Sequence, residues 1–413
     1  MNIPQEIVEA IADELEYSSL YAFSLASIHF VHPSQARIFR SLQIRVEGSS
    51  NDGGRTLSTD YRHMSPWQAD RVFSSSPHLA SYVRRLWVDI PPPKHYPRMM
   101  RDLVRPMYCY PPLQIVLPTF SGIRELVISG PSSQRWAVLP QALKDAIQAI
   151  MLLSSLNELH FSGLSIPPAL IGFVVASVSA LTLSYVVVEN AELQSLPTAA
   201  QVLRILTLRN ISDSMVTFLA KPGALSVQHL SFMYPVMGDH INKILQGSAD
   251  TLTQLRFGVE HMRLLGDVQV PYLHELRVLE LDSELSVTLG PYYCLPRLFV
   301  SILTQIPRAM PHLDRVLLRA TISELRASMW SGGEDARWED SGPLDLGHLG
   351  VVHAQLRFID YLPFDFSEAT RELREKMYGR FVRSMGEQLP ALRDNGGLSF
   401  SQLVIPLYTQ SKL

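Results

Sequence analysis

Leu156-Asn-Glu-Leu159-His-Phe161 sets the pattern of this chain: apolar, two variable residues, apolar, one variable residue, apolar. The pattern returns five times, as Val178-Ser-Ala-Leu181-Thr-Leu183, Leu203-Arg-Ile-Leu206-Thr-Leu208, Val227-Gln-His-Leu230-Ser-Phe232, Leu252-Thr-Gln-Leu255-Arg-Phe257 and Leu276-Arg-Val-Leu279-Glu-Leu281. The middle apolar residues, at 159, 181, 206, 230, 255 and 279, are 22, 25, 24, 25 and 24 residues apart. A period sustained in this range is typical of stacked-repeat proteins.

Each copy of the pattern predicts one strand and its orientation. Its second and third apolar residues are two apart, so they lie on one face of a strand, and the residues between them face the other way. A return segment then covers the apolar face, and we expect helices over 141–154, 213–219, 237–245 and 367–389. The sequence therefore predicts an α/β fold: an irregular solenoid with parallel strands on its concave face and helices or loops on its convex face.

Weaker copies extend the predicted solenoid in both directions. They begin at Phe39, Val83 and Ile123 upstream, and as Leu313-Asp-Arg-Val316-Leu-Leu318, Leu356-Arg-Phe-Ile359-Asp-Tyr361 and Phe400-Ser-Gln-Leu403-Val-Ile405 downstream. Three segments interrupt the period and are predicted to be insertions. They are a Gly/Ser-rich loop at 48–62, a proline-rich extended segment at 91–118 and a long loop at 328–347.

Composition limits the classes of function. The 413 residues are 46% hydrophobic and 18% charged, with a formal net charge of -3, so no global basic field attracts nucleic acid or an anionic membrane. Cys109 and Cys294 are distant in sequence, which argues against a disulfide framework and favours a reducing compartment. The first residues do not resemble a secretory signal. We expect an intracellular protein, cytoplasmic, nuclear or both.

One uncharged stretch, 164–188, tests this expectation, since 169–188 is long enough to cross a bilayer as a helix. The stretch also contains Val178-Ser-Ala-Leu181-Thr-Leu183, in phase with the neighbouring copies. We therefore favour a buried helix over 170–176 followed by a strand, and no membrane association.

Residues 3–40 show no strand alternation and predict three short helices, the third opening at Pro33. In the first, Ile7, Ile11 and Leu15 lie on one face, with Val8 and Ala12 beside them. Such a small cluster either completes its core on a partner or caps the first repeat.

These residues resemble an F-box. The resemblance rests on Ile3-Pro4-Gln-Glu6-Ile7, Ile11, Leu15, Leu20, Ser24-Leu25-Ala26-Ser27, Phe30 and Phe39-Arg40-Ser41-Leu42. Ile3, Ala26 and Phe30 replace the usual Leu, Val and Trp, and all three remain apolar. F-box proteins commonly carry leucine-rich repeats directly afterwards. The resemblance therefore implies an F-box-like module at 1–41 and a divergent leucine-rich-repeat solenoid at 42–413.

The resemblance also implies a function: a substrate-recognition adaptor of a cullin-based ubiquitin ligase, docked on its Skp-type adaptor. By motif position, the adaptor-facing surface is formed or supported by Ile3, Pro4, Ile7, Leu15, Leu20, Leu25 and Phe30. The repeats depart from the family pattern, since the usual Asn or Cys positions hold Leu164, Val186, Ile211, Pro235 and Glu260.

The variable strand positions are the predicted binding surface for an unidentified protein substrate. They are Glu158, His160, Thr182, Ser184, Thr207, Arg209, Ser231, Met233, Arg256, Glu280 and Asp282, with Arg315 and Arg319 following. Their mixed charge suits a protein partner better than nucleic acid. The alternative is an unused, solvated face.

The sequence offers no catalytic constellation. A glycine-rich phosphate loop, a Gly-x-Ser-x-Gly elbow and a His-Glu-x-x-His motif are all missing. His29 and His32 have metal-like spacing, but no nearby Cys or carboxylate completes a site. We expect no enzyme, cofactor or metal. The second hypothesis is a repeat scaffold outside the ubiquitin pathway, whose amino-terminal helices are only a cap.

Overall fold

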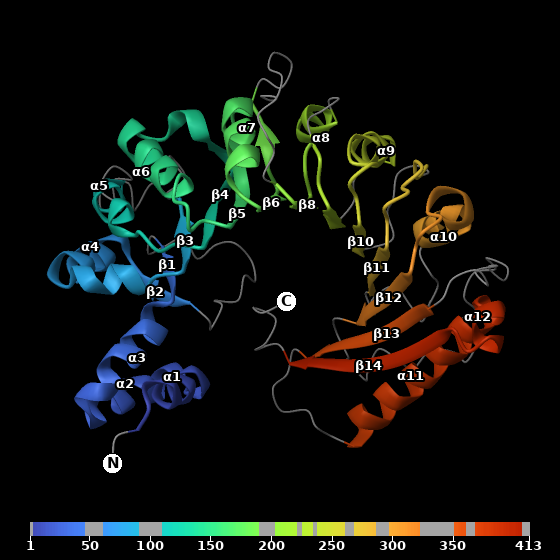
Figure 1. Cartoon of the computed structure of the whole chain (residues 1–413), viewed down its shortest axis with the longest axis horizontal. Coiled ribbons are helices and arrows are strands. Elements are labelled where there is room, and N and C mark those ends of the chain that lie inside the picture. The colour runs from blue at the N-terminus through green and yellow to red at the C-terminus, as the bar shows by residue number, and fades with distance from the viewer. Residues whose placement is uncertain are drawn as a thin grey trace, which may run out of the picture. The chain divides into compact units, whose positions relative to one another are not determined.

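The computed structural model describes residues 3–45, 61–90, 110–189, 203–220, 225–233, 238–260, 268–285, 297–322, 351–360 and 368–406. The chain divides into two compact units, Met1–Leu203 and Arg204–Leu413. Each has a parallel sheet with helices packed on one face, so the fold is mixed α/β, as predicted (Figure 1). The predicted boundary at residue 41 falls inside the first unit, where the last of three amino-terminal helices meets the first strand.

Those helices are α1 (Gln5–Glu14), α2 (Tyr17–Ala26) and α3 (Ile28–Phe39), which confirms the prediction of three. The predicted start of the third helix at Pro33 is wrong. Ser27 accepts a hydrogen bond from the His29 backbone N–H at 3.3 Å and so caps α3, which begins at Ile28 and includes Pro33. Proline is tolerated in the first turn of a helix, but inside one it loses a backbone hydrogen bond and its ring crowds the preceding turn, so a proline alone does not mark where a helix begins.

Both α1 and α2 pack against α3. Val8 and Ala12 of α1 and Leu20 of α2 are buried, and the rings of Phe23 and Phe30 stack at 4.3 Å. At the other end of α3, Phe39 is buried and meets Phe73 edge to face at 6.0 Å. The helices are thereby fixed to the rest of the first unit.

The sheet of the first unit has the order β2-β1-β3-β4-β5-β6, all parallel, and β7 pairs with β5. Its strands are β1 (Ser41–Ile44), β2 (Arg62–Met64), β3 (Arg85–Asp89), β4 (Glu125–Arg135), β5 (Glu158–Ile166), β6 (Ala180–Ser184) and β7 (Val187–Val188). Strands β2 and β7 are not predicted from the sequence. Of the loop predicted at 48–62, the structure describes Tyr61 and Arg62. Arg62 is already the first residue of β2, so the predicted loop is one residue too long at this end.

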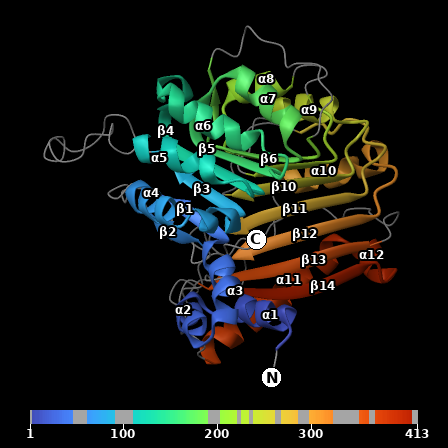
Figure 2. The same ribbon diagram turned by 60° about the vertical axis from the view of Figure 1, so that its left-hand side comes forward.

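The helices of the first unit lie on one side of its strands (Figures 1 and 2). They are α4 (Pro66–Ser75), α5 (Tyr110–Val116), α6 (Gln141–Met151), α7 (Pro168–Ser177) and the 3-10 turns η1 (Pro77–Tyr82), η4 (Leu117–Thr119) and η5 (Trp136–Val138). The prediction of extended backbone at 110–118 is wrong. Pro111 and Pro112 occupy the first turn of α5, where no backbone donor is needed, and Leu113 and Val116 anchor the helix in the core.

The second unit has seven described strands in chain order, β8 to β14, all parallel. They are β8 (Ile205–Arg209), β9 (His229–Met233), β10 (Gln254–Glu260), β11 (Val278–Leu285), β12 (Arg315–Ile322), β13 (Val351–Asp360) and β14 (Leu398–Pro406). The helices are α8 (Asp213–Leu219), α9 (Gly238–Gly247), α10 (Arg297–Ala309), α11 (Glu368–Gln388) and α12 (Pro390–Asp394). The predicted helices at 213–219, 237–245 and 367–389 are confirmed within two residues.

The six central copies of the pattern all form strands, and their apolar pairs are aligned across each sheet. In the second unit Leu230 pairs with both Leu206 and Leu255, and Leu255 pairs with Leu279. The predicted registers of the last two strands are wrong. In β13 the aligned core residues are Val352 and Ala354, and in β14 they are Leu398 and Phe400. The predicted Leu403 and Ile405 have the opposite parity to Leu398, and Leu403 is exposed.

Three consecutive repeats share a backbone feature four residues after the middle apolar position. Gly163, Tyr185 and Asn210 have φ of 67°, 54° and 46°. The next residues, Leu164, Val186 and Ile211, are buried, so an apolar side chain fills the place where leucine-rich repeats often have Asn or Cys. The left-handed residue turns the chain so that this side chain enters the core.

Tyr185 is the residue least suited to that conformation, because the left-handed region costs a residue with a Cβ about 1–2 kcal/mol. Tyr185→Gly is expected to raise the free energy of unfolding by up to about 1 kcal/mol, since the side chain is exposed and loses little burial. Chemical denaturation measures it. As control, Tyr21→Gly changes an equally exposed tyrosine inside α2 and should lower stability by about 1 kcal/mol. A loss at Tyr185 equal to that at Tyr21 would contradict the prediction.

The prediction of a buried helix followed by a strand in the uncharged stretch 164–188 is confirmed, with the ten-residue α7 followed by β6. In the described part of the chain, no helix combines the length and apolar character needed to cross a membrane. The predicted insertion at 328–347, and residues 91–109 of the second one, lie outside the described residues.

Candidate protein-interaction surfaces

Two surfaces carry the residues that the sequence selects: the first lies within the first unit, and the second is described separately in each unit. The first is made of exposed apolar side chains on the amino-terminal helical segment. Six large apolar side chains are exposed there, more than elsewhere in the described chain for a segment of this length; they are Ile3, Ile7, Ile11, Tyr21, Leu25 and Ile28. We call these six residues the amino-terminal apolar surface.

Helix α1 shows how this surface arises. Its apolar residues occupy two adjacent stripes, and the stripe with Val8 and Ala12 faces α3. The stripe with Ile7 and Ile11 therefore remains outside, with Ile7 at 51% exposure. At the end of α2 and the start of α3, Leu25 and Ile28 are more exposed still, at 87% and 83%.

The seven residues predicted to face an adaptor divide by burial. Ile3, Pro4, Ile7 and Leu25 are exposed, Leu15 and Phe30 are half-buried, and Leu20 is buried. Leu20 and Phe30 therefore support the helices, Phe30 through its stack on Phe23. Ile11, Tyr21 and Ile28 belong to the exposed set but are missing from the predicted one. The helical period of Ile3, Ile7 and Ile11 is the signal that indicates Ile11.

The second surface is, in each unit, the sheet face opposite the described helices, which we call the polar face of that unit. All eleven predicted substrate-binding residues lie at strand positions of these faces, alternating with core residues. In the first unit, His160 and Ser184 are joined by a 3.0 Å hydrogen bond across β5 and β6. Glu158 lies beside Glu125 in the register, and partial burial, with repulsion from Glu125, raises the pKa of Glu158, while Arg85 opposes the shift.

A second polar cluster of the first unit is missing from the predicted set. The Trp87 indole Nε1 donates to Ser129 Oγ at 2.6 Å, and Ser129 also bonds the Asp89 carboxylate. Gln43 donates to the same carboxylate at 2.8 Å. These side chains hydrogen-bond to one another, so the cluster links β1, β3 and β4.

In the second unit, three predicted residues form a charged network. Arg256 Nη2 donates to Asp282 Oδ2 at 2.7 Å and lies 3.9 Å from Glu280 through Nε. Arg319 pairs with Glu280, and Arg357 Nη1 lies 3.8 Å from Asp282. The carboxylate side chains are only 10% and 11% exposed. They hold the three arginines in place across β10, β11, β12 and β13.

Sequence reasoning misses Arg357 and His353 because it misplaces the register of β13. His353 lies between Ser399 and Ser401, with 2.8 Å from each ring nitrogen to a hydroxyl oxygen. Partial burial and the neighbouring Arg315 and Arg319 lower the pKa of His353. Thr207, Arg209, Ser231 and Met233 lie further along the face on β8 and β9, half-buried.

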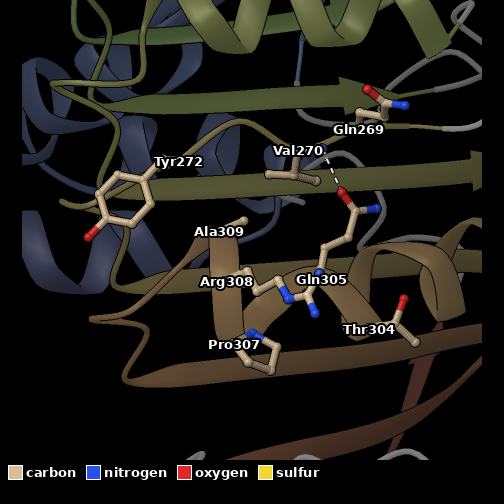
Figure 3. Close-up of a pocket in the computed structure, with 8 residues that line it drawn as sticks. All are labelled: Gln269, Val270, Tyr272, Thr304, Gln305, Pro307, Arg308 and Ala309. Carbon is tan, nitrogen blue, oxygen red and sulfur yellow. Dashed lines mark hydrogen bonds between the residues drawn. The ribbon is translucent and has the colours of Figure 1, made fainter.

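A pocket of about 730 Å³ lies on the helical side of the second unit, between residues 269–272 and α10 (Figure 3). The Gln305 amide spans it, accepting from the Val270 backbone at 2.9 Å and donating to the Val268 carbonyl at 2.8 Å. Among its described lining residues none is a carboxylate, cysteine or histidine, and Arg308 is the charged one. Its polar contacts join the chain before β11 to α10.

The described residues contain no group of three or more His, Cys, Asp or Glu able to hold a metal ion. Compared with known proteins, the chain matches no protein-family model and no curated protein.

Proposed function

We propose that this chain is a substrate-recognition adaptor of a cullin-based ubiquitin ligase. Its amino-terminal helices bind a Skp-type adaptor. Its repeats form a divergent leucine-rich-repeat solenoid whose polar face binds a protein substrate. The observation that carries the proposal is the amino-terminal apolar surface, on a helical segment whose motif residues resemble an F-box.

A complex that fully buries one exposed Ile or Leu side chain gains about 1.5–3 kcal/mol from its removal from water. Six of the seventeen large apolar side chains that are exposed in the described chain occur within residues 3–28. Concentrated exposure of this kind marks an interaction site, whereas single exposed apolar residues are ordinary.

The alternative is a scaffold whose helices only cap the first repeat. One observation favours a capping role for α3: Phe39 is buried against Phe73, and the Arg62 guanidinium lies 4.3 Å from its ring centroid. A cap alone leaves the outward residues of α1 and α2 without a role. We therefore assign α3 to both tasks and the outer side of α1 and α2 to binding.

The test is association with a purified Skp-type adaptor, measured by isothermal titration calorimetry. The double substitution Ile7→Glu with Leu25→Glu is expected to weaken binding at least 100-fold, because central apolar residues of an interface each contribute about 2 kcal/mol or more. The melting temperature should stay within about 2 °C of the wild type, since surface substitutions change stability by about 0.5 kcal/mol.

Ile115→Glu provides the matched control. Ile115 is 58% exposed on α5 and lies outside the amino-terminal apolar surface, so its substitution should leave adaptor binding unchanged. Absence of binding by the wild-type chain would refute the adaptor function. Equal weakening by Ile115→Glu would show that the measured contact is nonspecific.

A deletion separates the two hypotheses. Removal of residues 1–26 takes away α1 and α2 and keeps α3 on the first repeat. If α1 and α2 form an adaptor-binding module, the shortened chain remains soluble and folded but loses the adaptor. Aggregation or unfolding on deletion, together with unchanged adaptor affinity of Ile7→Glu/Leu25→Glu, would support the cap instead.

A further inference from the structure

Charge is distributed unevenly over the polar face of the second unit. Among the side chains that the structure describes, the carboxylates at these strand positions are Glu280 and Asp282, both on β11. The described strands β12, β13 and β14 carry none there. They carry Arg315, Arg319 and Arg357, with His353 among them, and we call the three arginines the arginine strip.

The arginines on this face outnumber the described carboxylates that pair with them. Glu280 and Asp282 are shared among Arg256, Arg319 and Arg357. Arg315 is exposed, and no ion pair joins it to any described residue. Guanidinium groups recognise carboxylates through paired, charge-assisted hydrogen bonds, so a strip held in place with unused donors suits an anionic partner.

His353 lies next to the arginine strip. It is on β13, in register with Leu317 of β12, and partial burial, followed by the positive charges of Arg315 and Arg319, lowers its pKa. Its ring nitrogens are already engaged with Ser399 and Ser401. A carboxylate bound at the strip would offset the contribution of the two arginines and so raise the pKa of His353.

The geometry distinguishes an acidic protein segment from nucleic acid. Arg315 and Arg319 are four residues apart on one strand, about 13 Å, which equals the spacing of carboxylates four residues apart in an extended peptide. The described polar-face positions of β12–β14 hold no Phe, Tyr or Trp ring on which a base could stack, and both ring nitrogens of His353 are bonded to Ser399 and Ser401. Glu280 and Asp282 lie beside the strip and repel the continuous charge of a phosphate backbone. A short run of acidic side chains meets the arginines and avoids these carboxylates.

We propose that Arg315, Arg319 and Arg357 form a docking site for an extended, acidic segment of a protein partner. As a statement about the substrate, this rests on the proposed adaptor function. The test below uses the purified chain without any ubiquitin-ligase component, so a failure of adaptor binding and a failure of this site are separate results.

The probe is a fluorescent nine-residue peptide with glutamates four residues apart, and the measurement is fluorescence anisotropy with the full chain. Arg315→Glu is expected to weaken binding about 5- to 10-fold, since reversal of one exposed charge changes affinity by about 1 kcal/mol. Binding by the wild type should weaken as salt is added. Arg308→Glu is the matched control, because it makes the same change on α10, on the helical side of the same unit.

A second measurement follows the His353 ring by NMR. The pKa of His353 should rise when the glutamate peptide binds and should not move with a peptide carrying Gln at both positions. The proposal is overturned if the Gln peptide binds equally well, if Arg308→Glu weakens binding as much as Arg315→Glu, or if only a phosphoserine peptide or a single-stranded RNA binds.

Discussion

Replacing Phe257 by alanine is expected to lower the melting temperature of the second unit by roughly 6–20 °C, because removal of a buried aromatic ring costs about 3–5 kcal/mol. Phe257 is 2% exposed, and its ring stacks on that of Phe232 with centroids 5.5 Å apart. The register places Phe257 directly between Phe232 of β9 and Leu281 of β11. Its loss therefore opens a cavity between neighbouring repeats.

Calorimetry measures this effect, with two variants to define it. Phe257→Leu keeps part of the side-chain volume, and it should lower the free energy of unfolding by less than half as much as Phe257→Ala. Val404→Ala on β14 removes an exposed apolar side chain and should change stability by under about 0.5 kcal/mol. A similar small change for Phe257→Ala would mean that this position does not join the repeats.

The repeated strands could be predicted because one short pattern recurs at nearly constant spacing. Each copy alone is weak, but Leu206, Leu230, Leu255 and Leu279 support a common register, which the structure confirms. Where the spacing lengthens, this support is lost. Strand β13 contains apolar residues of both parities near Leu356, so local alternation cannot choose between two registers.

The error in β13 carries over to the candidate site. The sequence places Arg256, Glu280 and Asp282 on one face, but the predicted register of β13 leaves Arg357 and His353 out. The amino-terminal helices show a different limit. Val8 and Ile7 are adjacent apolar residues, and only the position of α3 decides which is buried and which is exposed. Helical periodicity finds a stripe but not its partner.

The charged network gives the second large effect. Glu280→Ala is expected to lower the free energy of unfolding by about 3–5 kcal/mol, because removing one member of a buried ion pair leaves the other uncompensated. Arg319 would lose its carboxylate in a site where its own side chain is 18% exposed, and the amide of Gln254 would lose a 2.8 Å acceptor. Chemical denaturation of the second unit measures the loss.

A double-mutant cycle tests whether the loss comes from the pair. If Glu280 and Arg319 act through each other, Glu280→Ala combined with Arg319→Ala should cost less than the sum of the single changes by about 1–3 kcal/mol. The pair of Arg277 and Asp314, 3.8 Å apart and exposed, is the internal control, and Asp314→Ala should cost under about 1 kcal/mol. Added salt should weaken the exposed pair and leave the buried one largely unchanged. Strict additivity at Glu280 and Arg319 would mean that the arginines are held by the backbone register alone, and that the carboxylates do not position the arginine strip.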